Sequence, residues 1–278
     1  MQLLLPILSG LLMALSMPGA SLGWLAFIGL VPLLLALRDK SPRESLKLGY
    51  IGGATFGLVL FYWIYALWEW ISALAIPTHL LMAVYMGIFW AVFGWGYAHL
   101  RDRLPTWVLV AVAPALWVSL EYSRSLTIFG FPWGQVADAL TIDSLLPFAQ
   151  IAGYTGIWGA SFLVVLINLL IYAVVAKRQY AYGVAVSAIL VIAFIWGSHS
   201  LSPYESEAEE IEIAMLQPSI PQIERSKPEN LYVSLGIYKT LLDKVVASGR
   251  ELDLVVLPES ALQAYVLDQS DLRDYFVT

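Results

Sequence analysis

Seven apolar stretches dominate the first 198 residues of this 278-residue chain. They cover residues 3–17, 22–37, 50–68, 78–99, 106–120, 156–176 and 180–197. A helix that crosses the hydrocarbon core of a bilayer needs about 20 apolar residues, within a range of about 17–25. Four of the stretches reach that length, and the other three approach it with their flanking residues. The pattern predicts a polytopic α-helical membrane domain of about seven spans over residues 1–198.

The composition excludes several classes of protein. Hydrophobic residues make up 59% of the chain and charged residues 13%, whereas soluble globular proteins are about half apolar and about a quarter charged. The chain has no cysteine, which excludes a disulfide, a thiolate metal site and a cysteine nucleophile within it. A net charge of −6 argues against a nucleic-acid partner. The sequence contains no ligand cluster that implies a metal or an organic cofactor.

The basic residues of the loops predict the orientation in the membrane. The loops after the second, fourth and sixth stretches hold eight of them, and the alternate loops hold only Arg124. The eight are Arg38, Lys40, Arg43, Lys47, Arg101, Arg103, Lys177 and Arg178. Because cytoplasmic loops carry the excess of Lys and Arg, we expect the N-terminus in the cytoplasm and residues 199–278 outside it. The first stretch has no positive residues before it, so we interpret it as a retained helix and not as a signal peptide.

Residues 199–278 have a different composition. They carry six basic and fourteen acidic residues, against nine and seven in residues 1–198. Alternating and then apolar residues at 211–217 predict a strand, the helical spacing of apolar residues over 229–248 predicts a helix, and 252–257 predict a second, buried strand. A strand, a helix and a strand of these lengths predict a parallel pair with a right-handed crossover.

Two sites emerge from the residues themselves. Glu259 directly follows the second predicted strand, and active sites of open α/β sheets lie beyond the carboxyl ends of their strands. A carboxylate there can act as a general base, or it can simply cap the next turn. The loop between the fifth and sixth stretches holds Phe131-Pro132-Trp133 after Glu121 and Arg124. An ion pair and a turn with an interfacial tryptophan are the simplest interpretation of that loop.

Several short motifs together resemble one family. In order they are Pro18-Gly19, Glu121 with Arg124, residues 130–133, residues 150–156 leading to Asn168, residues 217–222, and residues 257–260. Each motif is weak alone, but their order, spacing and the predicted topology make the chain similar to the N-terminal half or more of a bacterial apolipoprotein N-acyltransferase. That family joins a multi-span membrane domain to a periplasmic nitrilase-type domain. The resemblance implies that residues 199–278 begin an αββα sandwich.

The resemblance also implies a reaction and its partners. An acyl chain would move from a phospholipid to a cysteine thiol, and then to the α-amine of an apolipoprotein's N-terminal diacylglyceryl-cysteine. Glu259 matches the glutamate of the family's Glu-Lys-Cys triad and would be the general base. Phe131, Pro132 and Trp133 would lie on the side of the membrane that borders the site, where they would contact the lipid. The implied location is the bacterial inner membrane, with a cytoplasmic N-terminus and a periplasmic C-terminal domain.

The chain departs from the family pattern in several places. The family's lysine and cysteine follow its glutamate, and we expect a chain that ends at Thr278 to be truncated before both and inactive alone. Ser219 stands where the family has asparagine, and Ser226 and Leu257 stand where it has tryptophan. Two alternatives stay open. The protein could be another membrane-anchored nitrilase-type acyl or amide transferase, or a non-catalytic membrane remnant or scaffold.

Overall fold

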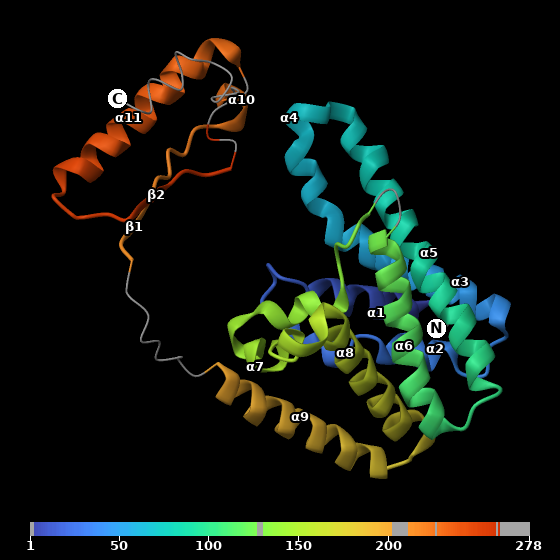
Figure 1. The fold of residues 1–278 in the computed structure, drawn as a ribbon. Coiled ribbons are helices and arrows are strands. Elements are labelled where there is room, and N and C mark those ends of the chain that lie inside the picture. The colour runs from blue at the N-terminus through green and yellow to red at the C-terminus, as the bar shows by residue number, and fades with distance from the viewer. Residues whose placement is uncertain (1–2, 127–129, 202–210, 226, 260, 262–278) are drawn as a thin grey trace. The chain divides into compact units, whose positions relative to one another are not determined.

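The chain forms two compact units, Met1–Pro203 and Tyr204–Thr278. The structure, a computed structural model, describes residues 3–126, 130–201, 211–225, 227–259 and 261 (Figure 1). Each unit has its own secondary structure, and each is described by itself below. The predicted motif residues Ser226 and Ser260 lie outside the described residues.

The first unit consists of α-helices joined by short 3₁₀ helices. In chain order they are α1 (Leu4–Leu15), η1 (Gly23–Phe27), α2 (Val31–Leu37), α3 (Pro42–Leu60), η2 (Phe61–Leu67), α4 (Trp68–Ile71), η3 (Ser72–Leu74), α5 (Ala75–Arg101), α6 (Thr106–Leu126), η4 (Val136–Thr141), η5 (Asp143–Leu145), α7 (Leu146–Ala149), α8 (Ala152–Lys177) and α9 (Ala181–Ser200).

Helix α3 begins eight residues before the apolar stretch predicted at 50–68. Its first turn has a capping box. The Glu44 amide donates to Ser41 Oγ at 3.3 Å, and the Ser41 amide donates to Glu44 Oε2 at 3.0 Å. Pro42 at the first helical position has a backbone angle suited to a helix start. The helix therefore starts at a polar cap, which a search for apolar residues alone does not detect.

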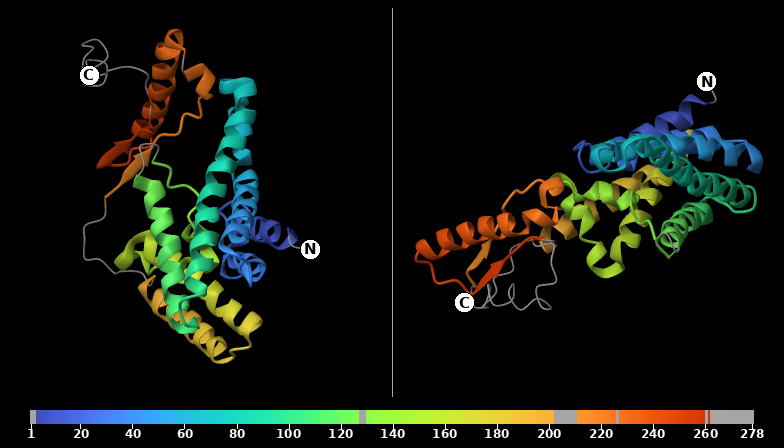
Figure 2. Two further views of the ribbon diagram at one scale, coloured as in Figure 1. Left: turned by 90° about the vertical axis from the view of Figure 1, so that its right-hand side faces the viewer. Right: turned by 90° about the horizontal axis from the view of Figure 1, so that it is seen from above.

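Helices α3 and α5 form the closest helix pair of the unit and run side by side in both views of Figure 2. Glycines of α3 at positions 49, 53 and 57 face α5. A Cβ added at Gly53 would lie 2.6 Å from the Cβ of Trp90, and one added at Gly57 would lie 2.7 Å from the Cα of Ala83. Small residues four positions apart allow two backbones to approach closely, as in the helix pairs of membrane proteins.

Four helical stretches of the described residues are long and apolar enough to cross a membrane. They are Pro42–Arg101, Thr106–Leu126, Ala152–Lys177 and Ala181–Ser200. The first has 60 residues and contains the antiparallel pair α3 and α5. Leu4–Leu15 and Gly23–Leu37 are shorter apolar helical stretches. The second of these is not one helix as predicted, because η1 and α2 are separate and α2 begins at Val31 with Pro32 in its first turn.

Hydrogen bonds join the loops that hold the basic residues. The Arg101 guanidinium donates from Nη1 to the carbonyl of Leu37 at 2.6 Å and from Nη2 to the carbonyl of Lys40 at 3.0 Å. Lys177 Nζ donates to Thr106 Oγ1 at 2.9 Å. The loops after α2, α5 and α8 therefore lie at the same end of the first unit.

A buried asparagine of α8 joins that helix to η1 and α2. Asn168 Nδ2 donates to the carbonyl of Ala26 at 2.7 Å and to the carbonyl of Val164 at 2.9 Å. Its Oδ1 accepts from the Leu30 amide at 2.8 Å. Satisfied hydrogen bonds of a buried side chain fix the packing of the segments that they join. Asn168, one of the motif residues, therefore has a structural role in this fold.

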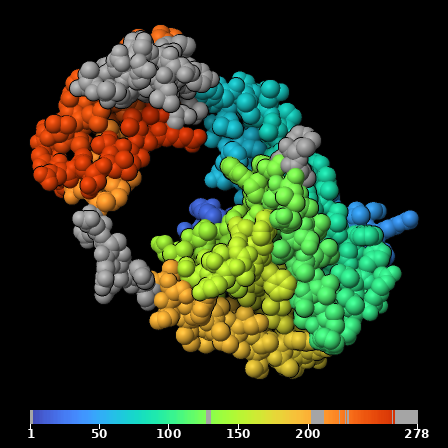
Figure 3. Space-filling view, in the orientation of Figure 1, coloured from blue at the N-terminus to red at the C-terminus, as the bar shows by residue number. Residues whose placement is uncertain are grey.

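The apolar core of the first unit is extensive. Its buried cluster draws on residues from Met13 to Tyr172, and the largest fully buried side chains include Tyr97, Phe56, Phe61 and Phe93. Helix α9 is the exception, because Gly197 is its one buried residue. Its apolar side chains form part of the outer surface of the unit (Figure 3).

The second unit contains the predicted strand, helix and strand. Strand β1 (Ile213–Met215) pairs in parallel with β2 (Leu254–Val256), with Ile213 opposite Leu254. The short helices α10 (Gln222–Arg225) and η6 (Pro228–Asn230) and the longer α11 (Leu231–Ala247) connect them. The prediction of one β–α–β unit with parallel strands is confirmed. The prediction that the second strand is buried is wrong for the described residues, because Leu254 and Val256 of β2 are 49% and 40% exposed.

Candidate functional site

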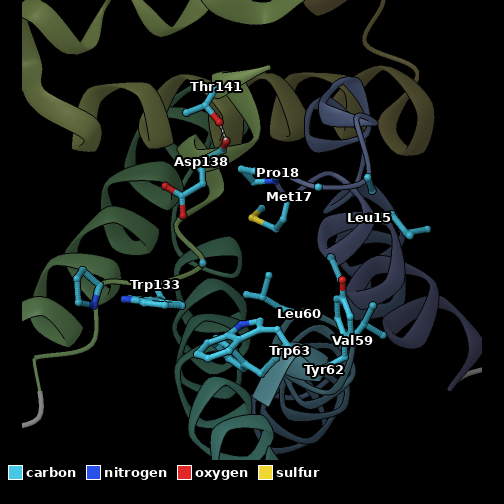
Figure 4. A pocket seen from close by; sticks show the side chains of 16 residues that line it. Leu15, Met17, Pro18, Val59, Leu60, Tyr62, Trp63, Trp133, Asp138 and Thr141 are labelled. Atoms are coloured by element: carbon cyan, nitrogen blue, oxygen red, sulfur yellow. Dashed lines mark hydrogen bonds between the residues drawn. The ribbon is translucent and has the colours of Figure 1, made fainter. Parts of the chain in front are cut away.

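The first unit contains a cavity of about 650 Å³. Three segments that are far apart in the sequence line it: the end of α1 with the loop that follows it, the junction of α3 and η2, and the loop from Pro132 into η4 (Figure 4). The lining residues are Ala14, Leu15, Met17, Pro18, Gly19, Ala20, Val59, Leu60, Phe61, Tyr62, Trp63, Pro132, Trp133, Gly134, Asp138 and Thr141. The cavity therefore brings together two of the motifs noted in the sequence, Pro18-Gly19 and Pro132-Trp133.

An aromatic group forms one wall of this cavity. The indole rings of Trp63 and Trp133 have their centroids 4.9 Å apart, and 51% of Trp133 is exposed. Phe131 does not line the cavity. Its ring packs behind the wall, with centroid distances of 5.5 Å to Phe61 and 5.9 Å to Trp133. Of the three loop residues predicted to contact a substrate, Pro132 and Trp133 line the cavity and Phe131 supports them.

The loop that carries Trp133 turns at a glycine. Gly134 has a φ of +70°, and a Cβ added there would lie 2.6 Å from Leu60 Cδ2. A side chain at this position would combine the left-handed backbone with a clash against α3. Gly134 therefore permits the loop to lie against the end of α3, where the cavity forms.

Glu121 holds the other end of the same loop. The Glu121 side chain is 5% exposed. Its Oε1 accepts from the Val136 amide at 2.9 Å and from Trp117 Nε1 at 2.9 Å. The carboxyl group of Glu121 on α6 thus fixes the start of η4, from which Asp138 reaches the cavity.

Arg124 binds the loop one helical turn further along α6. The residue is 3% exposed. Its Nη2 donates to the carbonyl of Gly134 at 3.4 Å, and its own carbonyl accepts from the Phe131 amide at 3.1 Å. Its Nη1 lies 2.8 Å from Met86 Sδ on α5. Glu121 and Arg124 are thus best described as positioning residues for the loop, a role that sequence analysis did not assign to them.

Asp138 is the cavity residue that sequence analysis missed. Its Oδ2 accepts from the Gln135 amide at 3.0 Å, and its side chain lies at the edge of the cavity in Figure 4. Burial raises the pKa of the Asp138 carboxyl to about 6, against the opposing effects of hydrogen bonds from the backbone and of the Arg124 charge. A single carboxylate in the apolar segment Val136–Leu140 is the sequence signal that could have identified it.

Glu259 belongs to the second unit. It is exposed and lies three residues after the last residue of β2, as the sequence predicted. Pro258 precedes it and contributes a residue with a fixed φ between the strand and the carboxylate. The described residues of neither unit contain three or more His, Cys, Asp or Glu side chains grouped so as to hold a metal ion.

Comparison with known proteins gives the family of the chain. The model of the apolipoprotein N-acyltransferase N-terminal domain matches residues 9–170. This match covers more than half of the chain and includes the cavity, Glu121, Arg124 and Asn168.

Proteins named apolipoprotein N-acyltransferase are similar over a longer range. The protein of Geobacter metallireducens is 32% identical, with 96% of this chain and 52% of the relative aligned. The proteins of Pasteurella multocida and Nitrosomonas europaea are 26% and 27% identical over 85% and 81% of this chain, and over 46% and 44% of their own lengths. The chain spans about half the length of these curated relatives. It is a membrane protein with apolar helices, and it belongs to the apolipoprotein N-acyltransferase family, whose N-terminal domain it contains.

Proposed function

We propose that this chain provides the membrane domain and the first β–α–β unit of an enzyme that acylates lipoproteins. The acyl donor is a phospholipid, and the acceptor is the α-amine of the N-terminal diacylglyceryl-cysteine of an apolipoprotein. The observation that carries the proposal is the convergence of two family motifs on one cavity with largely apolar walls. Such a cavity suits a lipid substrate, because most of a ligand pocket is apolar and a few polar groups orient the ligand.

The proposed topology uses the helical elements of the first unit. We propose seven crossings, made by α1, by η1 with α2, and by α3, α5, α6, α8 and α9. The hydrogen bonds of Arg101 and Lys177 support this topology, since they join the three loops that the positive charges assign to the cytoplasm. The N-terminus is then cytoplasmic, and the protein is a multi-pass protein of the bacterial inner membrane.

Residues 199–278 then begin a periplasmic domain of the nitrilase type. The parallel pair of β1 and β2 supports this assignment, since the central strands of such a domain are joined by helical crossovers. Glu259 follows β2, where the chemistry of open α/β sheets is found. The membrane domain was predicted to end at residue 198, which is close to Pro203, the last residue of the first compact unit.

The proposed reaction has two acyl-transfer steps. The thiolate of a cysteine attacks the ester carbonyl of the phospholipid, and Glu259 takes the thiol proton and returns it to the departing lysophospholipid oxygen. The amine of the acceptor then attacks the thioester, Glu259 takes a proton from the amine, and the thiol leaves. A covalent intermediate of this kind predicts ping-pong kinetics.

Residues 1–278 do not include every group of that reaction. They contain no cysteine, and the family's cysteine and lysine follow the glutamate in sequence. The lysine would stabilise the oxyanion, an effect worth about 3–4 kcal/mol for one such donor. The acyl transfer is therefore proposed for a protein as long as the relatives, about twice the length of this chain.

Replacement of Glu259 by glutamine tests the proposal. The protein is isolated from its native membranes, and transfer is measured from a phospholipid to a synthetic diacylglyceryl-cysteine peptide. We expect the Glu259→Gln variant to lose at least about 100-fold in kcat/KM, since a positioned general base contributes about 10²–10⁴-fold.

Glu251→Gln is the matched control, because Glu251 is exposed and precedes β2 by three residues. We expect this variant to transfer the acyl chain at the wild-type rate. Equal activity of the Glu259→Gln variant and the wild type would contradict the role of Glu259. Absence of transfer by the native protein itself would contradict the proposed function and favour a scaffold.

A further inference from the structure

The loops after α2, α5 and α8 form one basic surface at the same end of the first unit. Hydrogen bonds of Arg101 and Lys177 join the three loops, and in Figure 1 the turn between α8 and α9 lies at the end of the unit where α6 begins. The loops hold eight basic and three acidic residues within the segments 38–47, 101–106 and 177–180. This end of the unit therefore carries a local excess of positive charge.

The acidic residues of these loops are already paired. Each forms an ion pair with a basic residue of its own loop: Arg38 with Asp39 at 3.4 Å, Lys40 with Glu44 at 3.8 Å, and Arg101 with Asp102 at 2.9 Å. The Arg101 guanidinium also donates to two backbone carbonyls, and its side chain is only 14% exposed. Arg101 thus holds the loops together, and the three loops have no acidic side chain left to pair with Lys177.

Lys177 lies where the positive charges converge. Its Nζ donates to Thr106 Oγ1 at 2.9 Å, which is a neutral partner. The charges of Arg101 and Arg38 both act on Lys177, and both also act on Tyr172, five residues earlier in α8. The two guanidinium groups therefore lie near the end of α8, and we refer to Arg38, Arg101 and Lys177 as the cationic cluster. Because an ammonium group has three donors, Lys177 keeps two of them for a ligand.

The helix ends near Lys177 do not neutralise the cluster. Lys177 is the last residue of α8, and Thr106 is the first residue of α6. The carbonyl end of α8 is partially negative and the amide end of α6 is partially positive, so the two ends offset each other at this ammonium group. No acidic residue lies in the first turn of α6. Among the described residues the cluster thus keeps a net positive charge.

Aromatic side chains on both sides place the cluster at the level of lipid headgroups. Trp107 follows Thr106, Tyr180 lies three residues after Lys177, and each is 70% exposed. Exposed tryptophan and tyrosine side chains at the ends of membrane helices lie at the level of the headgroups. The anion available at that level is a lipid phosphate, and basic sites between helices on the cytoplasmic side bind anionic headgroups.

We propose that Lys177 and Arg38 bind the phosphate of an anionic phospholipid of the cytoplasmic leaflet, in a site whose loops Arg101 holds together. The inference rests on the proposed topology and goes beyond the proposed acyl transfer. Helix α6 separates the two sites, because it begins at the cluster and ends at Leu126, shortly before the loop that lines the cavity. Its 21 residues correspond to about 30 Å. The bound lipid is therefore a ligand that joins the loops and not the acyl donor.

Lipid binding to the 1–278 chain tests this inference without any need for turnover. The purified chain in a neutral detergent is titrated with phosphatidylglycerol and with phosphatidylcholine of the same acyl chains, and native mass spectrometry counts the bound lipid. We expect phosphatidylglycerol to bind about 10- to 30-fold more tightly, since each basic residue near an anionic headgroup contributes about 5-fold. Glycerol 3-phosphate, added as the soluble form of the same phosphate, should not displace the lipid.

Variants with one charge removed show whether the preference comes from the cluster. Lys177→Gln should lower it about 5-fold, and Lys177→Arg should keep it within about 2-fold. Arg43→Gln is the matched control, because Arg43 is exposed, lies in the same set of loops and is not among the charges that act on Lys177. This control should also stay within about 2-fold. Each glutamine variant keeps seven of the eight basic residues, so the charge bias that orients the chain remains.

The Arg38→Gln variant provides a second test of the cluster. It leaves the bond between Lys177 and Thr106 in place, and we expect it to lower the preference for phosphatidylglycerol about 5-fold as well. Arg38→Gln decides the matter if thermal unfolding shows that Lys177→Gln is not folded.

Three results would overturn the inference. The first is a wild-type chain that binds the two lipids equally. The second is an equal loss of preference in Lys177→Gln and Arg43→Gln, which would assign the effect to the total charge of the loops. The third is displacement of the lipid by glycerol 3-phosphate, which would assign the site to a soluble phosphate. None of them changes the outcome expected for Glu259→Gln, so a failure here is distinguishable from a failure of the proposed function.

Discussion

The two units of the chain expose apolar side chains for different reasons. In Met1–Pro203 the exposed leucine, isoleucine and valine side chains lie on long helices that also contribute to an extensive buried core. In Tyr204–Thr278 the described buried apolar side chains are Leu216, Leu235 and Tyr238, and 82% of Met215 on β1 is exposed. The first unit thus has a core of its own, whereas the described part of the second has two short strands, one long helix and two short helical turns.

The comparison separates two meanings of exposed apolar surface. On a helix that crosses a bilayer, lipid covers such a surface and the backbone hydrogen bonds are internal to the helix. On a strand, an exposed apolar side chain comes with an unpaired backbone edge, which needs a neighbouring strand or another cover. A two-stranded sheet with one helix buries too little apolar surface for independent stability. The described part of the second unit therefore leaves apolar strand surface uncovered in a way that the helices of the first unit do not.

Hydrogen exchange would show the largest difference between the units. We expect the amides of α11 in the 1–278 chain to exchange at least about 100-fold faster than those of α3, since regions with few buried contacts open at low free energy. Mass spectrometry of the detergent-solubilised chain measures both helices in one sample. If the amides of α3 and α11 exchanged at equal rates, the two units would not differ in local stability as proposed.

Loss of the Asn168 hydrogen bonds would weaken the first unit. The Asn168→Leu substitution leaves the buried Leu30 amide and the Ala26 carbonyl without their side-chain partner. We expect the free energy of unfolding to fall by about 3 kcal/mol, because each unsatisfied buried group costs about 1–3 kcal/mol. Thermal unfolding in detergent measures the change. Ser119→Ala, which removes an exposed hydrogen bond to the Ala115 carbonyl, is the control and should stay within about 0.5 kcal/mol of the wild type.

The same substitution in the two units should have opposite effects, both smaller. Gly53→Ala introduces a Cβ 2.6 Å from the Cβ of Trp90 and should destabilise the first unit by about 1–2 kcal/mol. Gly236→Ala in α11 meets no atom within 4 Å and should stabilise that helix by about 0.5–1 kcal/mol. Thermal unfolding reports the first change, and exchange of the α11 amides reports the second. Destabilisation by both would show that α11 is closely packed.

Much of the secondary structure could be predicted from apolar periodicity. The stretches at 78–99, 156–176 and 180–197 correspond to α5, α8 and α9, and the strand, helix and strand of the second unit occur where predicted. The prediction is wrong where polar residues, and not apolar ones, determine where a helix begins. Helix α3 begins at the capping box of Ser41, and the 3₁₀ helices of 136–145 have too few residues for any periodicity to be visible.

The site was predictable only in part, because its geometry depends on contacts between distant segments. Sequence analysis identified Pro132 and Trp133 by their motif, but no motif included Trp63. The contact between Trp63 and Trp133 depends on how α3 and η2 meet a loop 70 residues later. Asp138 reaches the cavity because Glu121 fixes the start of η4. Neither arrangement follows from a local pattern, since one depends on ring packing and the other on a hydrogen bond between segments distant in sequence.

The hydrogen bonds of Asn168 also set an order of events during synthesis. They join positions separated by 138 and 142 residues, so residues 1–37 leave the ribosome long before α8 exists. During that interval the Leu30 amide and the Ala26 carbonyl have no partner from α8. Residues 1–37 are therefore made first but complete their packing only after Asn168 of α8 has been made, and a ribosome paused before codon 168 would hold an assembly intermediate.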